Sequence, residues 1–396
     1  MSDSTVLVFT EHNTPREAFT MGFLLRDVLG ITPQLCNSRE QFDGWIGPKF
    51  SYGKEPLGEA LHFYANGLLT ETGTESNAPE VSNHEGHKVL YPHGNRGALP
   101  FDVFAATFYL VSRYEEYQPH ALDQYQRFPA SASLAHKYGF LSQPVVDQWA
   151  MLLKGILQEH FSALTFPERS YRFVSTVDVD NAYEYLEKGL MRTMGAYARS
   201  ILRMNTTDLK ERTRTLFGLD HDAYDTFDHL ADIEKRYGLE AIYFFLVGDY
   251  GLNDKNVPIS SRKFQSLIKT VGDRAQVGIH PSFNSNTEPE RIGMEIGRLS
   301  KVLHIPIRKS RQHFLKLTFP STYRQLIERE ITEDYTMGYA SQLGFRAGLH
   351  PFPVLRSRPG AGNRPTCIPV LHHGGNAEVL PKRRASQRHG APCPHY

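Results

Sequence analysis

Cysteine is scarce in this chain, and its spacing excludes two kinds of stabilising site. Cys36, Cys367 and Cys393 are the three cysteines among 396 residues. They offer neither a disulfide framework nor the C-x-x-C pair typical of structural metal sites. Disulfide-poor chains are typical of reducing compartments, so we expect a cytoplasmic protein.

Long apolar runs are also missing. The longest apolar stretch, Ala241 to Val247, is far shorter than the roughly 18 residues that a membrane-spanning helix needs. The N-terminal residues Met1 to Thr5 lack the basic and apolar regions of a signal peptide. We therefore expect no membrane span.

An excess of positive charge, the usual mark of nucleic-acid binding, is confined to the last part of the chain. The formal net charge is +1, with 44 Lys and Arg against 43 Asp and Glu. Residues 349–396 hold seven of these basic residues and one acid, which leaves 37 against 42, or −5, for residues 1–348. A mildly acidic body does not favour a nucleic-acid partner.

Apolar residues are abundant enough to form a core, and they recur at the spacings of an α/β protein. They make up 40% of the chain. The first part predicts strands over 5–9, 60–64 and 88–91 and helices over 16–29, 101–117 and 144–161. A boundary follows near Leu164 to Pro167, so we expect an N-terminal α/β domain over residues 1–165.

Residues 166–348 predict a second domain in which strands alternate with helices. Strand patterns cover 171–180, 241–247 and 276–280, and helical patterns cover 182–203, 208–217, 225–237, 261–271, 288–303 and 321–329. This alternation is typical of parallel β/α units and is compatible with a barrel. The Val, Phe and Thr residues of the 171–180 segment predict a buried strand.

Polar side chains follow the predicted strands of this second domain. Asp178 and Asp180 end the first strand, and His280 ends the third. Active sites of β/α barrels lie at the carboxyl ends of their strands. Residues two apart on a strand face the same side, so both aspartates could converge on one cation. An isolated Asp-x-Asp is more often a helix cap beside an exposed acid, and it needs this context.

A cation and a second imidazole occur further along, at Arg311 and His313. A lone histidine is usually structural, but His280 follows an apolar strand as the aspartates do, which favours a functional role. Asp178, Asp180, His280 and His313 together form a donor set suited to zinc or a similar divalent ion. The sequence therefore predicts a divalent-metal site.

Five short motifs, taken together, give the second domain a family likeness. The motifs are Ser175 to Asp180 (STVDVD), Gly278 to Ser282 (GIHPS), Arg311 to His313 (RQH), Pro320 to Tyr323 (PSTY) and Gly344 to Gly348 (GFRAG). In this order they resemble the polysaccharide deacetylase (NodB-type) superfamily, and more closely a bacterial branch with an extra N-terminal domain. The stretches FDVFAATFYLVSRYEEY and PVVDQWA in residues 1–165 are similar to that branch as well.

The resemblance implies a fold and an activity. The expected fold is a distorted, incomplete β/α barrel joined to an N-terminal α/β domain. The expected reaction is removal of an N-acetyl or related acyl group from a carbohydrate, with one divalent metal, zinc being the expected ion. By the same resemblance Asp178 would be the general base and Asp180 a metal ligand, and Arg311 would hold the base or the developing oxyanion.

Asn284 departs from the family pattern. The second motif of the family supplies two histidines four residues apart, whereas His280 is followed at that spacing by Asn284. Asn is a poor zinc ligand. We therefore expect His313 to complete a metal set of Asp180, His280 and His313; without it the metal would be bound weakly.

Periodicity ends abruptly after Gly348. Residues 349–396 contain eight of the 24 prolines and five of the 18 histidines. Such a Pro-, Arg- and His-rich segment does not continue a β/α barrel. Either it is an irregular basic tail, or the reading frame was lost near Gly348. The late strand that carries the family's histidine acid is not found.

Two classes of function stay open. The first is a metal-dependent carbohydrate deacetylase or a related acyl hydrolase. The second is a catalytically inactive carbohydrate-binding or scaffold relative, because Asn284 and the missing late strand weaken the site. A phosphotransferase built on the Asp-x-Asp pair is disfavoured, since no Gly-rich phosphate loop follows the strand.

Overall fold

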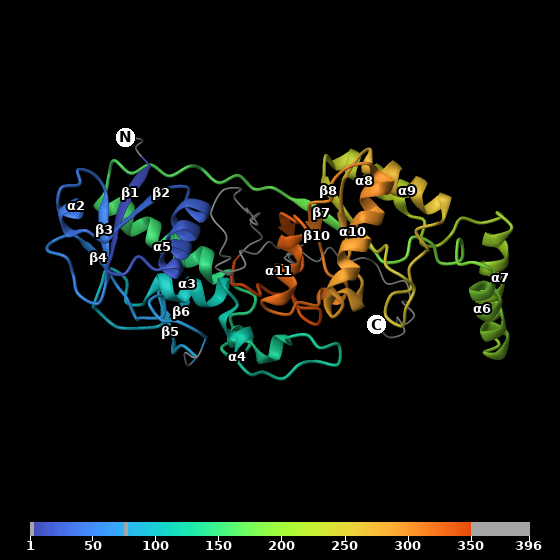
Figure 1. Cartoon of the computed structure of the whole chain (residues 1–396), viewed down its shortest axis with the longest axis horizontal. Helices are drawn as coiled ribbons and strands as arrows, with labels where there is room; N and C mark the ends of the chain where they lie inside the picture. The colour runs from blue at the N-terminus through green and yellow to red at the C-terminus, as the bar shows by residue number, and fades with distance from the viewer. Residues whose placement is uncertain (1–3, 75–77, 350–396) are drawn as a thin grey trace.

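The computed structural model describes residues 4–74 and 78–349, which form an elongated molecule built around two parallel β-sheets (Figure 1). Residues 350–396 of the predicted tail, and with them the question of the reading frame, lie outside the described residues. No helix within the described ranges is long and apolar enough to cross a membrane.

The first sheet has four parallel strands in the order β2-β1-β3-β4. Its central strand β1 buries Val6 and Val8 in the main apolar core, while Leu7 packs on the other face in a small cluster with Phe42. A short antiparallel pair, β5 and β6, follows. The strands are β1 (Thr5–Thr10), β2 (Thr32–Cys36), β3 (Lys49–Gly53), β4 (Leu61–Tyr64), β5 (Val81–His84) and β6 (His87–Leu90).

Helix α3 (Val103–Val111) lies in the apolar core, and every residue of it is buried. The Asp102 carboxylate caps its N-terminus by accepting the N–H groups of Phe104 and Ala105, and it also accepts the Tyr52 hydroxyl. The other helices of this part are α1 (Pro15–Met21), continued by the π-helix η1 (Gly22–Val28), α2 (Arg39–Asp43), α4 (Leu134–Lys137) and α5 (Val145–His160), with 3-10 turns η2 (Tyr114–Tyr117) and η3 (Ala130–Ala132).

The second sheet has five parallel strands in the order β7-β8-β9-β10-β11. It is curled, and within the described residues it does not close into a barrel, because β7 and β11 are its two edges. The strands are β7 (Val174–Val179), β8 (Glu240–Phe245), β9 (Gln276–Ile279), β10 (Lys309–Ser310) and β11 (Glu333–Asp334). The connections carry α8 (Phe227–Tyr237), α9 (Arg262–Gly272), α10 (Pro289–Leu303) and α11 (Ser321–Glu328), with 3-10 turns η4 (Phe283–Asn286) and η5 (His313–Leu315).

Strand β7 is half-exposed, so the prediction of a buried strand was wrong. Residues 174–177 are partly accessible and Asp178 is exposed. The reason is its place at the edge of an open sheet, where one side has no neighbouring strand. Its partner β8 is the buried strand, with Ala241 to Phe245 inside the core.

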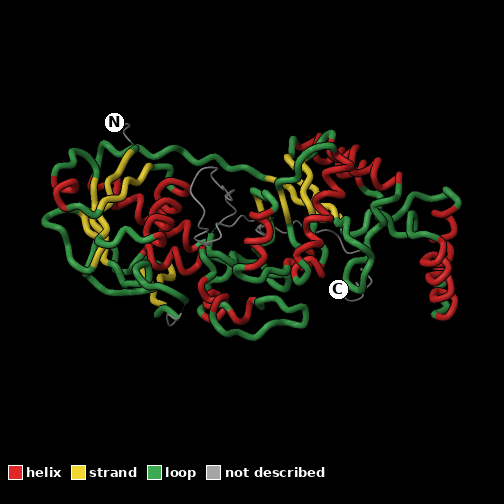
Figure 2. The backbone as a smooth tube through the Cα atoms, in the orientation of Figure 1, coloured by secondary structure: helices red, strands yellow, loops and turns green. Residues whose placement is uncertain are grey.

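Two helices between β7 and α8 stand apart from the rest of the molecule (Figure 2). They are α6 (Leu190–Leu202) and α7 (Thr206–Leu216). A single helix over 182–203 was predicted, but residues 182–189 are not helical. The Asp222 carboxylate accepts the backbone N–H groups of Glu184, Tyr185 and Leu186. Because these groups are bonded to a side chain, the backbone here is irregular and not helical.

The GFRAG motif joins the two sheet regions. A side chain at Gly344 would lie 2.7 Å from the Leu141 carbonyl oxygen, so glycine is needed for this close approach. Gly348 has a positive φ of 73° and packs against Leu110 and the start of α5. Its carbonyl accepts the Val146 N–H at 2.7 Å. This motif therefore fixes the end of the described chain onto the N-terminal region.

Arg346 of the same motif makes a buried bidentate ion pair with Glu116. Its Nε and Nη2 atoms lie 2.8 and 2.5 Å from the two Glu116 oxygens, and Arg113 Nε lies 2.7 Å from one of them. Burial alone would raise the pKa of Glu116, but the two guanidinium groups hold it below its ordinary value. Glu116 thus contacts both buried cations, and Glu115 pairs with Arg113 as well.

Glu116→Gln should destabilise the fold strongly. Removing this charge leaves Arg113 and Arg346 buried with reduced compensation, which costs about 3–5 kcal/mol for a broken buried pair. Urea unfolding followed by circular dichroism measures the change. Glu330→Gln removes one partner of the exposed Arg308–Glu330 pair and should change little. Equal midpoints for the two variants would contradict this role of Glu116.

Candidate metal centre

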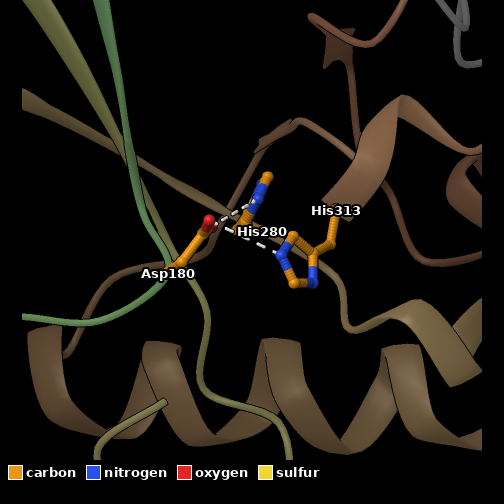
Figure 3. Close-up of side chains that lie close together, drawn as sticks. All are labelled: Asp180, His280 and His313. Atoms are coloured by element: carbon orange, nitrogen blue, oxygen red, sulfur yellow. Dashed lines mark ion pairs between the residues drawn. The ribbon is translucent and has the colours of Figure 1, made fainter. Parts of the chain in front are cut away.

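Three side chains meet at the carboxyl edge of the second sheet (Figure 3). Asp180 follows β7 directly, His280 follows β9 directly, and His313 comes three residues after β10. Because parallel strands end at the same edge, residues distant in sequence become neighbours there. One possible ligand atom from each of the three lies within 4.8 Å of the others.

The Asp180 carboxylate lies between the two imidazoles. Its Oδ1 is 3.0 Å from His280 Nε2, and its Oδ2 is 3.5 Å from His313 Nε2. The two rings are 5.0 Å apart between centroids. The Asp180 side chain is 47% exposed overall, yet its Oδ1 atom is buried and receives no hydrogen bond of acceptable geometry. A cation is one partner that can satisfy a buried oxygen without a donor.

The backbone of Arg311 orients His280. The His280 Nδ1 atom lies 2.6 Å from the Arg311 carbonyl oxygen, which can only accept, so Nδ1 carries the proton. In the neutral ring this leaves a lone pair on Nε2, directed toward Asp180. Histidines that bind metals are commonly held by such a hydrogen bond from their other nitrogen.

A buried carboxylate, Asp254, orients His313. Its Oδ1 lies 2.8 Å from His313 Nδ1 and also accepts the Phe283 N–H at 2.9 Å. As with His280, the second nitrogen then faces Asp180. Asp254 lies in the loop after β8, where the sequence has no periodic pattern, and sequence reasoning missed it.

The three-residue group has the chemistry of a divalent-metal site. Two neutral imidazole lone pairs and a carboxylate oxygen would repel one another if they faced each other without a proton or a cation between them. One Asp and two His are ligands that zinc takes in proteins, with further positions left for water or substrate. The donor set, its orientation and the unsatisfied Asp180 oxygen all fit a divalent ion.

The electrostatics of the group favour its charged forms. Burial lowers the pKa of His313, but hydrogen bonds and charges from Asp180 and Asp254 outweigh it and raise that pKa to about 9. Burial likewise opposes ionisation of Asp180, yet His280 and His313 hold its pKa well below the ordinary value. The site therefore favours positive charge, which protons or a metal ion could supply.

Asp178 is kept apart from this group. Its Oδ2 lies 3.3 Å from Arg311 Nε, and Arg311 Nη1 donates to Thr176 Oγ1 at 2.9 Å. Asp178 and Asp180 therefore do not converge on one point in this structure. One aspartate faces a fixed guanidinium and the other faces two imidazoles, so the two carboxylates are placed for different tasks.

Asn284 lies outside the group. It is exposed on the 3-10 turn η4, and its carbonyl accepts N–H groups of the following turn. His313 is the second imidazole beside Asp180.

Buried hydrogen bonds hold the loops that carry these residues. Glu295 of α10 accepts the Ser282 N–H and hydroxyl at 2.9 and 2.5 Å, two residues after His280. On the other side, Ser310 and Tyr323 both donate to Asp334. Ser282 of the GIHPS motif and Tyr323 of the PSTY motif thus have a supporting role.

Aromatic rings flank the group of Asp180, His280 and His313, which is called the metal group below. Tyr125 packs on Phe314 at 4.9 Å and on Phe283 at 6.4 Å between ring centroids, and Phe314 lies 4.5 Å from the His313 ring. All three rings are partly accessible. Phe314 has a positive φ of 60°, an uncommon conformation that costs energy for an aromatic residue. Tyr125 lies in a polar, irregular segment and was missed from the sequence.

The Tyr125 loop belongs to the N-terminal region and reaches the second sheet region through a polar contact as well. Arg127 donates from Nη1 to the Phe314 carbonyl at 2.7 Å, and its Nε pairs with Asp123 at 2.8 Å. Residues of the first 165 positions therefore form part of the surroundings of the metal group.

Comparison with known proteins gives partial likenesses. Residues 6–162 match a sequence family described as "Family of unknown function (DUF7033)". No curated protein matches the chain. Among solved structures the chain is similar to a "putative polysaccharide deacetylase from Mycobacterium smegmatis", with 17% identity and a TM-score of 0.28 over 44% of this chain and 54% of that one. The chain thus spans about half the length of that protein.

Proposed function

We propose that this protein is a divalent-metal-dependent hydrolase that removes an N-acetyl or related acyl group from a carbohydrate. The observation that carries the proposal is the convergence of Asp180, His280 and His313, with a buried Asp180 oxygen that lacks a donor. Zinc is the ion that this donor set favours. When bound, a divalent ion polarises a carbonyl and makes water easier to deprotonate.

The residues around the metal group supply the other tasks of an acyl hydrolase. Asp178 is exposed on the edge strand, so it can meet water and take up its proton. Arg311 stands beside Asp178, with its guanidinium fixed by Thr176, and it keeps the base in place or stabilises a developing oxyanion. Asp254 holds the His313 ring in the orientation that a ligand needs.

The aromatic rings support a carbohydrate as the substrate. The C–H groups on the face of a sugar ring pack well on aromatic rings, and Tyr125, Phe283 and Phe314 lie next to His313. Tyr125 belongs to the N-terminal region, so we propose that residues 1–165 and 166–348 are two domains that form the substrate site jointly.

The variants Asp178→Asn and Asp180→Asn distinguish the role of the proposed base from that of the proposed metal ligand. Asp180→Asn should lose stoichiometric zinc. Asp178→Asn should keep the metal, while acetate release from N-acetylglucosamine oligomers falls about 100- to 10,000-fold, as expected for a lost general base. Mass spectrometry of dialysed protein measures the metal, and a coupled assay measures the acetate.

Asp232→Asn is the matched control, because Asp232 is an exposed acid on α8. It should leave both readouts unchanged. Full metal content in Asp180→Asn would remove the basis of the proposal. A wild-type protein that binds zinc and N-acetylated sugars but releases no acetate would instead support the inactive carbohydrate-binding alternative.

Protonation of His313 should compete with the metal. In metal-free protein the pKa of His313 is raised from 6.5 to about 9, so its charge stabilises the fold fully below pH 6.5 and this contribution is lost as the pH rises through 9. We expect the Tm advantage of chelator-treated wild type over His313→Gln to shrink between these values, while zinc affinity rises. Differential scanning fluorimetry measures the first and a competing chelator the second. A Tm difference independent of pH would contradict this.

Tyr125→Ala should weaken substrate binding more than turnover. Loss of one stacking ring is expected to raise KM about five-fold, with kcat nearly unchanged because the metal group is intact. Steady-state kinetics on the same oligomers measures both constants. Tyr171→Ala removes a ring that is exposed before β7 and serves as the control. A fall in kcat at constant KM would show that Tyr125 acts in the chemistry instead.

A further inference from the structure

Helix α6 carries an apolar stripe that faces solvent. At 100° per residue its large exposed apolar side chains lie within an arc of about 120°. Met191 and Leu202, near its two ends, are each 83% exposed. An exposed stripe of this kind is a mark of an interaction surface. It comprises Leu190, Met191, Met194, Ile201 and Leu202.

A different side of α6 packs on α7 through polar groups. Tyr197 and Thr213 share a hydrogen bond at 2.9 Å, and Ser200 donates to Asp208. Arg212 of α7 is buried and pairs with Asp208 at 3.1 Å. An amphipathic helix normally turns its apolar face inward. The pair α6 and α7 reverses this arrangement, so the apolar stripe is not the inner face of the hairpin.

The hairpin is also strongly basic. Residues 188–219 hold seven Lys and Arg against two acids, a net +5. The remainder of residues 1–348 then holds 30 basic and 40 acidic residues, a net −10. Arg199 is exposed beside the stripe, and Arg203 is exposed at the C-cap of α6. Positive charge and exposed apolar surface are therefore gathered on one small part of an acidic molecule.

The base of the hairpin is held firmly, and its helices project away from both sheets (Figure 1). Asp222 clamps three N–H groups before α6, and Arg192 donates to the Asn256 carbonyl at 3.2 Å. The stripe is thus exposed on a hairpin whose base is fixed to the rest of the molecule. Met204 in the turn and Phe217 after α7 add further exposed apolar side chains.

We propose that the α6–α7 hairpin binds the surface of an anionic phospholipid membrane. The apolar stripe enters the boundary between headgroups and acyl chains, and the exposed arginines of the hairpin contact the anionic headgroups. A second copy docked through the same stripe would bring two +5 surfaces together, so charge disfavours a dimer. Residues 349–396 are also basic, so charge disfavours them as the segment that covers the stripe. The proposal does not depend on the proposed hydrolase activity.

Vesicle binding of the full chain tests the proposal. Co-sedimentation is measured with vesicles of phosphatidylcholine and phosphatidylglycerol in equal parts and with vesicles of phosphatidylcholine alone. We expect binding to the first that weakens with added salt, and little to the second. Removing two charges in Arg199→Gln/Arg203→Gln should weaken binding about 25-fold, at about five-fold for each charge near the surface. Met191→Gln/Leu202→Gln should weaken it about ten-fold or more.

The matched controls lie on α2 and just after it, at the other end of the molecule. Ile46→Gln removes an apolar side chain that is 91% exposed, and Arg39→Gln removes an exposed charge. Neither should change vesicle binding. Binding that is equal with and without phosphatidylglycerol, or that survives both hairpin double variants, would overturn the proposal. So would a dimer in light scattering that the apolar variant dissociates, or tight binding of single-stranded RNA that the arginine variant abolishes in the absence of vesicle binding.

Discussion

The structure of the candidate site depends on how two imidazole rings are fixed. Each ring has its Nδ1 atom tied to an oxygen of the protein, the Arg311 carbonyl for His280 and the Asp254 carboxylate for His313. Both Nε2 atoms must then face Asp180. Because of this constraint, the acceptor atoms of three polar residues face one point, where they favour a positive charge. The buried carboxylates of Glu295, Asp254 and Asp334 hold the surrounding loops in place.

The parallel sheet makes this arrangement possible because all of its strands end on one side. Residues as far apart as Asp180 and His313 need no long loops to meet, since each lies within three residues of a strand end. The edge position of β7 adds an opening on one side. Asp178 therefore remains accessible on the same strand that leads Asp180 into the buried group.

Much of this could be predicted from the sequence, and the parts that could not have physical reasons. Apolar strands that end in Asp180 and His280 predict a shared edge, because strand ends of parallel units coincide. Asp254 and Tyr125 lie in segments without periodicity, so only the folded chain brings them to the site. Strands β10 and β11 have two residues each, which is too few to show the alternation of apolar and polar residues that predicts a strand. The apolar stripe of α6 predicts a helix, but the sequence pattern alone suggests that the stripe points inward.

The buried pair of Glu116 and Arg346 spans 230 positions of the chain. During synthesis the N-terminal region emerges long before Arg346 does, while Gly344 and Gly348 are still to be added. Until then Glu116 faces only Arg113, and the surface of α3 and α5 that later receives the GFRAG motif stays uncovered. The buried charge cluster of the N-terminal region is therefore completed only when Arg346, 230 residues after Glu116, has been added to the chain.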